Sequence, residues 1–248
     1  METITIKSFD GVTLAIHRLG EGRPVLLLHG LFSSAEVNWI KFGHAQALAD
    51  AGFQAIMPDL RVHGQSEAPQ EASAYPADVL VKDVFAIAEA LSLEDFDLAG
   101  FSLGARTCVQ AVLAGLAPRR LVLGGMGIEG LGNWAKRSAF FIDAIDRFDE
   151  LRPGDPAYFA KSFMRTMKVD RPAARMLLQS VQDTPEGALA SIAIPTLVVC
   201  GADDRDNGSA PALAEALPDA TYREVPGTHM SSVTEPEFGQ AIVEFLHN

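Results

Sequence analysis

A serine flanked by glycines is the feature of this 248-residue chain that points most directly to nucleophilic chemistry. Ser102 is the centre of the string Gly100-Phe101-Ser102-Leu103-Gly104, which follows an apolar run and opens a segment with helical patterning. At a strand-to-helix corner, a G-x-S-x-G string places the serine on a sharp turn that exposes its hydroxyl. The sequence context therefore predicts that Ser102 is a nucleophile, and an idle serine in a turn is the lesser alternative.

A serine hydroxyl needs a histidine base within hydrogen-bond reach and a carboxylate that orients this base. His229 is the candidate base, because it lies between the last predicted strand and the last predicted helix, at the same end of the sheet as Ser102. His29 and His63 lie on loops after strands and each precedes a glycine, so we expect them to brace those loops by hydrogen bonds. The other histidines are interpreted as packing or surface residues: His17, His44 and His247.

Several carboxylates are candidates for the acid that orients the base. Asp203 and Asp204 directly follow the strand predicted over residues 195–200, so their side chains emerge at the same edge of the sheet as the nucleophile. Asp204 is preferred over Asp203 and Asp206, and Glu129 is the alternative acid after an earlier strand. With Asp204, the order along the chain is serine, aspartate, histidine, as expected for a nucleophile on such a corner.

Strands and helices alternate along the chain that must position these residues. The predicted strands cover residues 3–7, 12–18, 24–28, 54–58, 96–99, 121–123, 195–200 and 222–225; the predicted helices cover 38–51, 80–91, 103–114, 211–217 and 235–246. The first two strands form a hairpin at a sheet edge. The alternation predicts an α/β fold with a mostly parallel central sheet and helices on both faces, and with ligands bound at the carboxyl ends of the strands.

Residues 128–190 break this alternation and have helical patterning with many aromatic side chains. We interpret them as a small inserted helical cap, with residues 1–127 and 191–248 forming the core domain. The segment has nine basic and nine acidic residues, so the whole net charge of −12 lies on the core. A cap that is less acidic than the core favours an anionic substrate, but an ordinary solvated helix face explains it better. The aromatic residues predict an apolar pocket under the cap.

The composition of the chain limits the classes of partner that it can bind. Hydrophobic residues make up 48% of the chain and charged residues 21%, which is typical of a globular protein. The charge of −12 disfavours nucleic acid, and the apolar runs are too short to span a membrane, so a small-molecule substrate is the expected partner. No export signal is recognisable, which predicts a cytoplasmic protein with Cys108 and Cys200 as unpaired packing residues. The histidines have neither the i, i+4 helical spacing nor the cysteine partners of a zinc site, and no dinucleotide site is suggested, so neither a metal nor a cofactor is expected.

Taken together, the sequence resembles the α/β-hydrolase family over essentially its whole length. The motifs that carry the resemblance are His29–Phe32, Asp59–Ser66, Gly100–Gly104 and the segments around Asp204 and His229. The resemblance implies that the main-chain N–H groups of Leu31 and Leu103 form an oxyanion hole. Two positions depart from the family pattern, Val62 where glycine is usual and Asn207 where proline is frequent, and these bear on the shape of two loops.

The resemblance also limits the kinds of reaction that the chain is expected to catalyse. Similar dehalogenases and epoxide hydrolases have aspartate at the position of Ser102, and dienelactone hydrolases have cysteine there. The chain is therefore expected to be a serine hydrolase that cleaves a small or medium, largely apolar ester, lactone or related carbonyl substrate. The alternatives are a C–C bond hydrolase or lyase, or a ligand-binding receptor without turnover. Arg106 resembles a residue of carbon–carbon lyases, but a position on the helix surface explains it as well.

Overall fold

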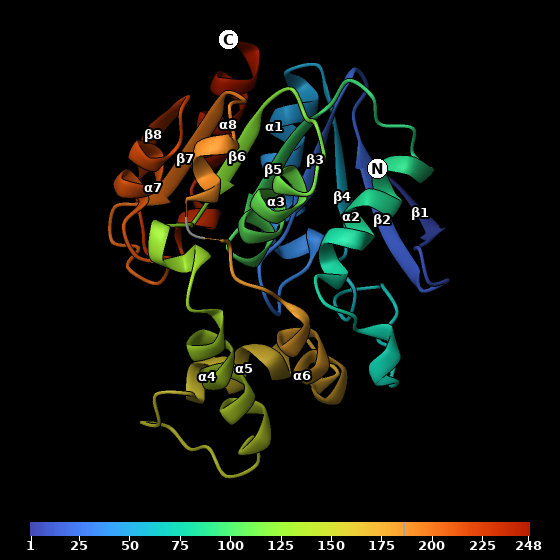
Figure 1. Cartoon of the computed structure of the whole chain (residues 1–248), viewed down its shortest axis with the longest axis vertical. Coiled ribbons are helices and arrows are strands. Elements are labelled where there is room, and N and C mark those ends of the chain that lie inside the picture. The colour runs from blue at the N-terminus through green and yellow to red at the C-terminus, as the bar shows by residue number, and fades with distance from the viewer. Residues whose placement is uncertain (186) are drawn as a thin grey trace.

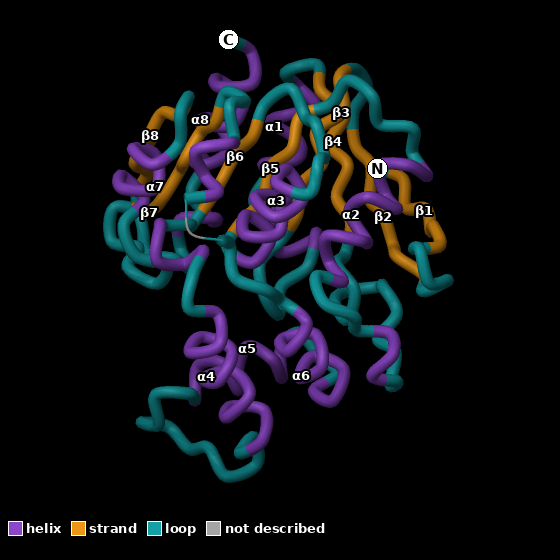
Figure 2. Tube along the Cα trace, in the orientation of Figure 1, coloured by secondary structure: helices purple, strands orange, loops and turns teal. Residues whose placement is uncertain are grey.

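The computed structural model describes residues 1–185 and 187–248 and is built around one eight-stranded sheet (Figures 1 and 2). The strands are β1 (Glu2–Lys7), β2 (Thr13–Leu19), β3 (Arg23–Leu28), β4 (Phe53–Pro58), β5 (Asp97–Phe101), β6 (Leu121–Gly124), β7 (Thr196–Gly201) and β8 (Ala220–Val225). Their order across the sheet is β1-β2-β4-β3-β5-β6-β7-β8. The β1–β2 and β2–β4 pairs are antiparallel and all others are parallel, which confirms both the edge hairpin and the mostly parallel sheet.

Helices cover both faces of this sheet, as predicted. They are α1 (His44–Asp50), α2 (Val79–Ala90), α3 (Leu103–Leu113), α4 (Trp134–Asp146), α5 (Tyr158–Thr166), α6 (Arg171–Ser180), α7 (Ala210–Ala216) and α8 (Pro236–His247). The apolar residues of α2, α3 and α7 belong to one core cluster, and those of α1 and α8 belong to the other. No helix within the described residues combines the length and the apolar character needed to cross a membrane.

The central strand β3 shows why the core strands are continuous apolar runs. Val25 and Leu27 lie in the cluster shared with α1 and α8, whereas Leu26 and Leu28 lie in the opposite cluster. Successive side chains of a strand point to opposite faces, so a strand covered on both sides needs apolar residues at every position. Burying each of these side chains stabilises the fold by about 1.5 to 3 kcal/mol relative to leaving it exposed.

The prediction of one helix over residues 38–51 is wrong. The structure has a short π-helix over Glu36–Ile40, and α1 then begins at His44. Gly43 separates the two with a left-handed backbone of φ 84°, which glycine adopts without steric cost. The π-helix places the side chains of Asn38 and Trp39 in the interior, and Asn38 becomes part of the site described below.

The segment between β6 and β7 contains α4, α5 and α6, which Figure 1 shows below the sheet and apart from the helices that flank it. We call residues 128–190 the α4–α6 segment. Its helices pack on one another, and the indole Nε1 of Trp134 in α4 donates a hydrogen bond of 2.8 Å to the carbonyl of Leu178 in α6. Apolar side chains of the segment belong to the same cluster as α2 and α3, so it packs on the core.

Candidate active site

Ser102 lies at the corner between β5 and α3 in a backbone conformation that only a constrained residue adopts. Its φ of 52° and ψ of −112° are unfavourable for any residue with a Cβ, and strain of this kind is typical of functional positions. The corner requires the two flanking glycines: a Cβ at Gly104 would overlap the carbonyl of Leu28, and a Cβ at Gly100 would overlap the backbone of Gly104. The close approach of α3 to β3 therefore depends on these glycines.

Three side chains from separate loops form a continuous chain of hydrogen bonds at the carboxyl edge of the sheet. His229, in the loop between β8 and α8, has its Nδ1 atom 2.8 Å from Oδ2 of Asp204 and its Nε2 atom 3.1 Å from Oγ of Ser102. A carboxylate only accepts hydrogen bonds, so Nδ1 carries the proton and Nε2 is left to accept from the serine hydroxyl. The arrangement can transfer a proton from Ser102 to His229.

Asp204 follows β7 and is buried by its surroundings. Burial alone raises the pKa of its carboxyl, but hydrogen bonds from His229, from the main-chain N–H of Asp206 and from the thiol of Cys200 outweigh burial, so the pKa is lowered overall. The Asp206 N–H donates to Oδ1 at 3.0 Å, and the Cys200 Sγ–H donates to Oδ2 at 3.3 Å. Asp204 is therefore held as an anion beside the imidazole.

The other candidate acids lie in different surroundings. Asp203 and Asp206 are exposed, and Asp206 faces the cavity described below. Glu129 accepts a hydrogen bond of 2.7 Å from the main-chain N–H of Ser209. Within the described residues, Asp204 is the carboxylate that the structure places in hydrogen-bond contact with His229.

The two expected oxyanion-hole residues, Leu31 and Leu103, line the same cavity as Ser102. Neither the Leu31 nor the Leu103 main-chain N–H donates to an acceptor among the described residues, and Leu103 is the first residue of α3. Unpaired N–H groups at a helix start attract negative charge. The loop that carries Leu31 is fixed by Asn38, whose Oδ1 accepts a hydrogen bond of 3.0 Å from the Gly30 N–H. These positions can stabilise an oxyanion formed next to Ser102.

His29 and His63 brace the loops beside the serine, which confirms that expectation. His63 Nε2 accepts from the main-chain N–H of Phe32 at 2.9 Å, and His29 Nε2 accepts from that of Leu60 at 2.9 Å. Both rings are fully enclosed, and burial lowers the pKa of each, for His63 to about 3. Each imidazole is therefore neutral at pH 7 and keeps the lone pair that accepts the loop N–H.

The two departures from the family pattern have distinct consequences. Val62 has a φ of 78°, so the chain keeps the left-handed backbone that glycine would adopt and places a β-branched residue in a strained conformation. Asn207 is buried, its Nδ2 donates to the Gly125 carbonyl at 2.6 Å, and its own carbonyl accepts from the Gly130 N–H at 2.9 Å. Asn207 thus ties the loop of the acid to the segment that follows β6.

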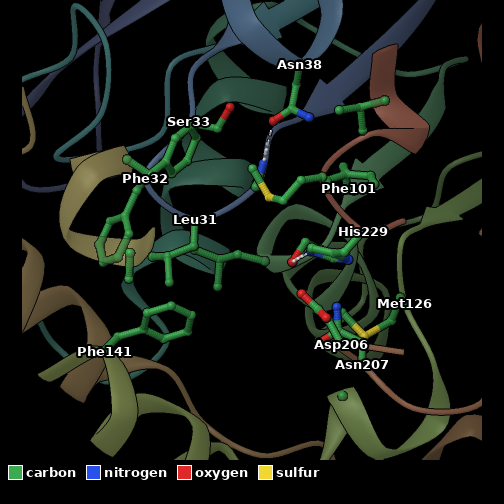
Figure 3. A pocket seen from close by; sticks show the side chains of 18 of the residues that line it. Leu31, Phe32, Ser33, Asn38, Phe101, Met126, Phe141, Asp206, Asn207 and His229 are labelled. Carbon is green, nitrogen blue, oxygen red and sulfur yellow. Dashed lines mark hydrogen bonds between the residues drawn. The ribbon is translucent and has the colours of Figure 1, made fainter. Parts of the chain in front are cut away.

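A cavity of about 430 Å³ opens in front of the serine, within the size range of small-molecule sites. Its apolar lining includes Leu31, Phe32, Phe101, Met126, Trp134 and Phe141. Figure 3 shows Leu31, Phe32 and Phe141 on one side of the cavity and His229, Met126, Asp206 and Asn207 on the other. Residues of α4 and α5 close the cavity opposite the sheet, so the α4–α6 segment contributes to its shape.

The explanation of Arg106 as a helix-surface residue is wrong. Arg106 lies one turn after the serine, is buried and lines the cavity. Its guanidinium donates to the Gly130 carbonyl, to the Gln182 carbonyl at 2.9 Å and to the Asp183 carboxylate at 2.8 Å, and it lies 4.9 Å from the ring centroid of Trp134. Arg106 therefore joins α3 to both ends of the α4–α6 segment. Arg106 follows Ser102 by four residues, about one helical turn, and this spacing is the sequence signal that could have revealed its position beside the cavity.

Arg137 is a second cavity-lining cation that the sequence did not single out. It lies on α4, and its Nη1 atom donates to the main-chain carbonyl of Asp206 at 2.7 Å, next to the loop of the acid. Burial lowers the pKa of its guanidinium, and the carboxylates of Asp206 and Asp204 partly offset that effect. The contact with Asp206 is long-range in sequence, so no local pattern marks it.

The remaining histidines do not reach the serine. His17 contacts the Asp59 carboxylate at 3.2 Å, His44 Nε2 donates to the Val233 carbonyl at 2.7 Å, and His247 is exposed, which confirms their interpretation as packing or surface residues. Both cysteines are buried and unpaired. Within residues 1–185 and 187–248, no group of three or more His, Cys, Asp or Glu side chains is arranged to hold a metal ion.

The sequence of this chain is similar to those of several known proteins. A family model described as alpha/beta hydrolase fold matches residues 23–123. The chain is 30% identical over 225 residues to the AB hydrolase superfamily protein YisY of Bacillus subtilis, covering 81% of each chain. It is 29% identical over 222 residues to the 2-hydroxymuconate semialdehyde hydrolase of Pseudomonas sp., covering 79% of this chain and 75% of that one.

Solved structures agree in fold. The esterase EaEST from Exiguobacterium antarcticum superposes with a TM-score of 0.78 at 18% identity, covering 100% of both chains. At this identity the similarity establishes the shared fold alone, because one fold hosts many unrelated functions.

Proposed function

The chain belongs to the α/β-hydrolase family, and we propose that it is a serine hydrolase with Ser102 as nucleophile, His229 as base and Asp204 as orienting acid. The observation that carries the proposal is the chain of hydrogen bonds from Asp204 through His229 to Ser102, of 2.8 Å and 3.1 Å, at a strained strand-to-helix corner. A strained serine with a base in reach has a cost that folding alone does not explain.

In the first half of the reaction, Oγ of Ser102 attacks the carbonyl carbon of the substrate while its proton passes to Nε2 of His229. The carbonyl oxygen gains negative charge and accepts hydrogen bonds from the N–H groups of Leu31 and Leu103. Donors of this kind that are already in place are worth about 3 to 4 kcal/mol each in related sites. Asp204 remains ionised and stabilises the imidazolium that His229 becomes.

In the second half, His229 gives its proton to the leaving oxygen, and the C–O bond breaks to leave an acyl group on Ser102. A water molecule then attacks the acyl carbon and gives its proton to His229. The bond between the acyl carbon and Oγ breaks as His229 protonates Oγ, which returns Ser102 to its initial state. The products are a carboxylic acid and an alcohol, or a single hydroxy acid when the substrate is a lactone.

The apolar cavity supports a largely apolar substrate of small to medium size, and the α4–α6 segment acts as its cap. The proposal thus places the chain among carboxylic ester hydrolases. Steady-state turnover of p-nitrophenyl acetate and butyrate by the wild type, and its loss in Ser102→Ala, would support it. Tight binding of these esters by the wild-type protein without turnover would contradict it and favour a ligand-binding role.

A further inference from the structure

Three of the large apolar side chains that this protein leaves exposed gather at the mouth of the cavity. Within the described residues, the exposed large hydrophobic residues are Met1, Phe9, Phe140, Phe159 and Met230. Phe140 is 43%, Phe159 61% and Met230 39% exposed, and all three also line the cavity of Ser102. Met230 directly follows His229, whereas Phe140 lies on α4 and Phe159 on α5. We call Phe140 and Phe159 the rim. Exposed apolar residues that cluster, rather than scatter, mark a surface with a binding role.

One side of the cavity connects the oxyanion loop to this rim through aromatic contacts. Phe32, directly after Leu31, is buried and meets Phe141 edge to face at a centroid distance of 5.6 Å. Phe141 in turn meets Phe140 edge to face at 5.3 Å. Figure 3 shows Phe32 and Phe141 beside Leu31. These contacts form an apolar path that starts next to the serine and ends at an exposed ring.

A second pair of rings borders the same opening. Phe159 and Phe163 of α5 stack with a centroid distance of 6.4 Å and an interplanar angle of 9°, and both line the cavity. Phe163 is partly buried against the core, whereas Phe159 is the more exposed residue of the rim. The rim therefore continues the inner wall outward on both α4 and α5.

The proposed reaction decides which half of the substrate follows the path. His229 must protonate the leaving oxygen, so the alcohol lies on the His229 side of the cavity. The acyl group then lies on the opposite side, where Figure 3 places Phe32 and Phe141. Resting on the proposed hydrolase function, we propose that the substrate carries a medium-length apolar acyl chain, which follows Phe32, Phe141 and Phe140 and emerges over the rim.

An acyl chain fits these observations better than a macromolecular partner does, because the rim residues line the inside of the cavity as well as its mouth. A chain that is anchored at Ser102 reaches them without leaving apolar surroundings. Each methylene that moves from water onto such a surface favours binding, and a change of one methylene in an apolar pocket typically changes specificity about tenfold or more when burial is complete. At a half-exposed rim the effect is smaller.

The test compares p-nitrophenyl acetate, butyrate, octanoate and decanoate, each below its critical micelle concentration, with the wild type, Phe140→Ser and Phe159→Ser. Phe9→Ser is the matched control, since Phe9 is 49% exposed but does not line this cavity. We expect wild-type kcat/KM to increase from acetate to decanoate. Each rim variant should lose about fivefold to tenfold on decanoate and less than about twofold on acetate, and the control should match the wild type throughout.

Several results would overturn the proposal. Equal losses on all four esters would show that the rim acts on the catalytic machinery and not on the chain. If decanoate is also assayed above its critical micelle concentration and the rim variants lose activity only there, the rim binds a lipid surface. A wild-type dimer that the rim variants convert to a monomer in light scattering would assign the rim to a second copy. Turnover of acetate with no effect of chain length would sink this inference alone, whereas no turnover of any ester would also sink the proposed function.

Discussion

Oδ2 of Asp204 lies 2.8 Å from Nδ1 of His229, and this contact fixes which ring nitrogen carries the proton. The same oxygen also accepts from the thiol of Cys200, and the other carboxylate oxygen accepts from the Asp206 N–H. The acid is thus held from three directions, and the imidazole that it orients presents its free lone pair to Ser102.

Asp204→Asn should lower kcat by about four orders of magnitude, because an amide donor facing Nδ1 favours the wrong tautomer of His229. Asp203→Asn, which alters an exposed neighbour, is the control and should leave kcat within about twofold of the wild type. Ester turnover with folded protein, checked by circular dichroism, measures both. Comparable losses in the two variants would contradict the assignment of the acid.

Cys200→Ala should lower kcat about threefold to tenfold, because it removes one hydrogen bond to the Asp204 carboxylate. Cys200→Ser keeps a donor at the position and should recover most of the activity. Cys108→Ala is the matched control, since Cys108 is also buried and unpaired but contacts no residue of the triad through a hydrogen bond among the described residues. If Cys108→Ala slows turnover as much, the effect is one of packing.

Arg106→Gln should destabilise the fold by about 3 kcal/mol or more, because it leaves two carbonyls and the Asp183 carboxylate without their donor. Asp183→Asn should cost less, about 1 kcal/mol, since Asp183 is half-exposed and an amide still accepts hydrogen bonds. Urea unfolding measures both free energies. Equal, small changes would show that Arg106 does not join the α4–α6 segment to α3 in solution.

Acid should destabilise the protein through His63. The pKa of His63 is lowered to about 3 in the folded protein, whereas a histidine of the unfolded chain has a pKa of about 6.5. Between these values the unfolded chain binds the additional proton, so stability increases with pH and is lost as pH falls from about 6.5 toward 3. At pH 5 the free energy of unfolding should be about 2 kcal/mol lower than at pH 7 through this group.

The control for this pH effect is His63→Gln, whose side-chain oxygen can still accept from the Phe32 N–H but does not titrate. Urea unfolding of both proteins at pH 7 and pH 5 should show that the variant loses less unfolding free energy between the two pH values than the wild type does. Parallel losses in the two proteins would show that other groups dominate, among which His29 is the first candidate because burial lowers its pKa as well.

Sequence patterns predicted the sheet and the approach of Ser102 to His229, because both depend on local sequence signals. The run Val25–Leu28 indicates a strand covered on both faces, and the glycines at 100 and 104 indicate a corner too tight for a side chain. The break at Gly43 was missed, since residues on either side of it continue a helical pattern and the π-helix depends on packing.

Long-range contacts account for the rest of what the sequence did not show. Arg106 lies on an apolar helix and its partners are 24 to 77 residues away, so nothing nearby indicates that it is buried. The exposure of Phe140 and Phe159 was equally hidden, because aromatic residues at helical spacing normally predict packing. Only the arrangement of α4 and α5 around the cavity distinguishes the rim residues from the ones that fill the core.

The proposed nucleophile and base are tested most directly by intact-mass spectrometry after incubation with a fluorophosphonate, which reacts with an activated serine. The wild type should gain one adduct located on Ser102, and both Ser102→Ala and His229→Ala should gain none while remaining folded. A folded wild-type protein that gains no adduct, or a Ser102→Ala variant that is labelled like the wild type, would contradict the assignment of Ser102 as the nucleophile.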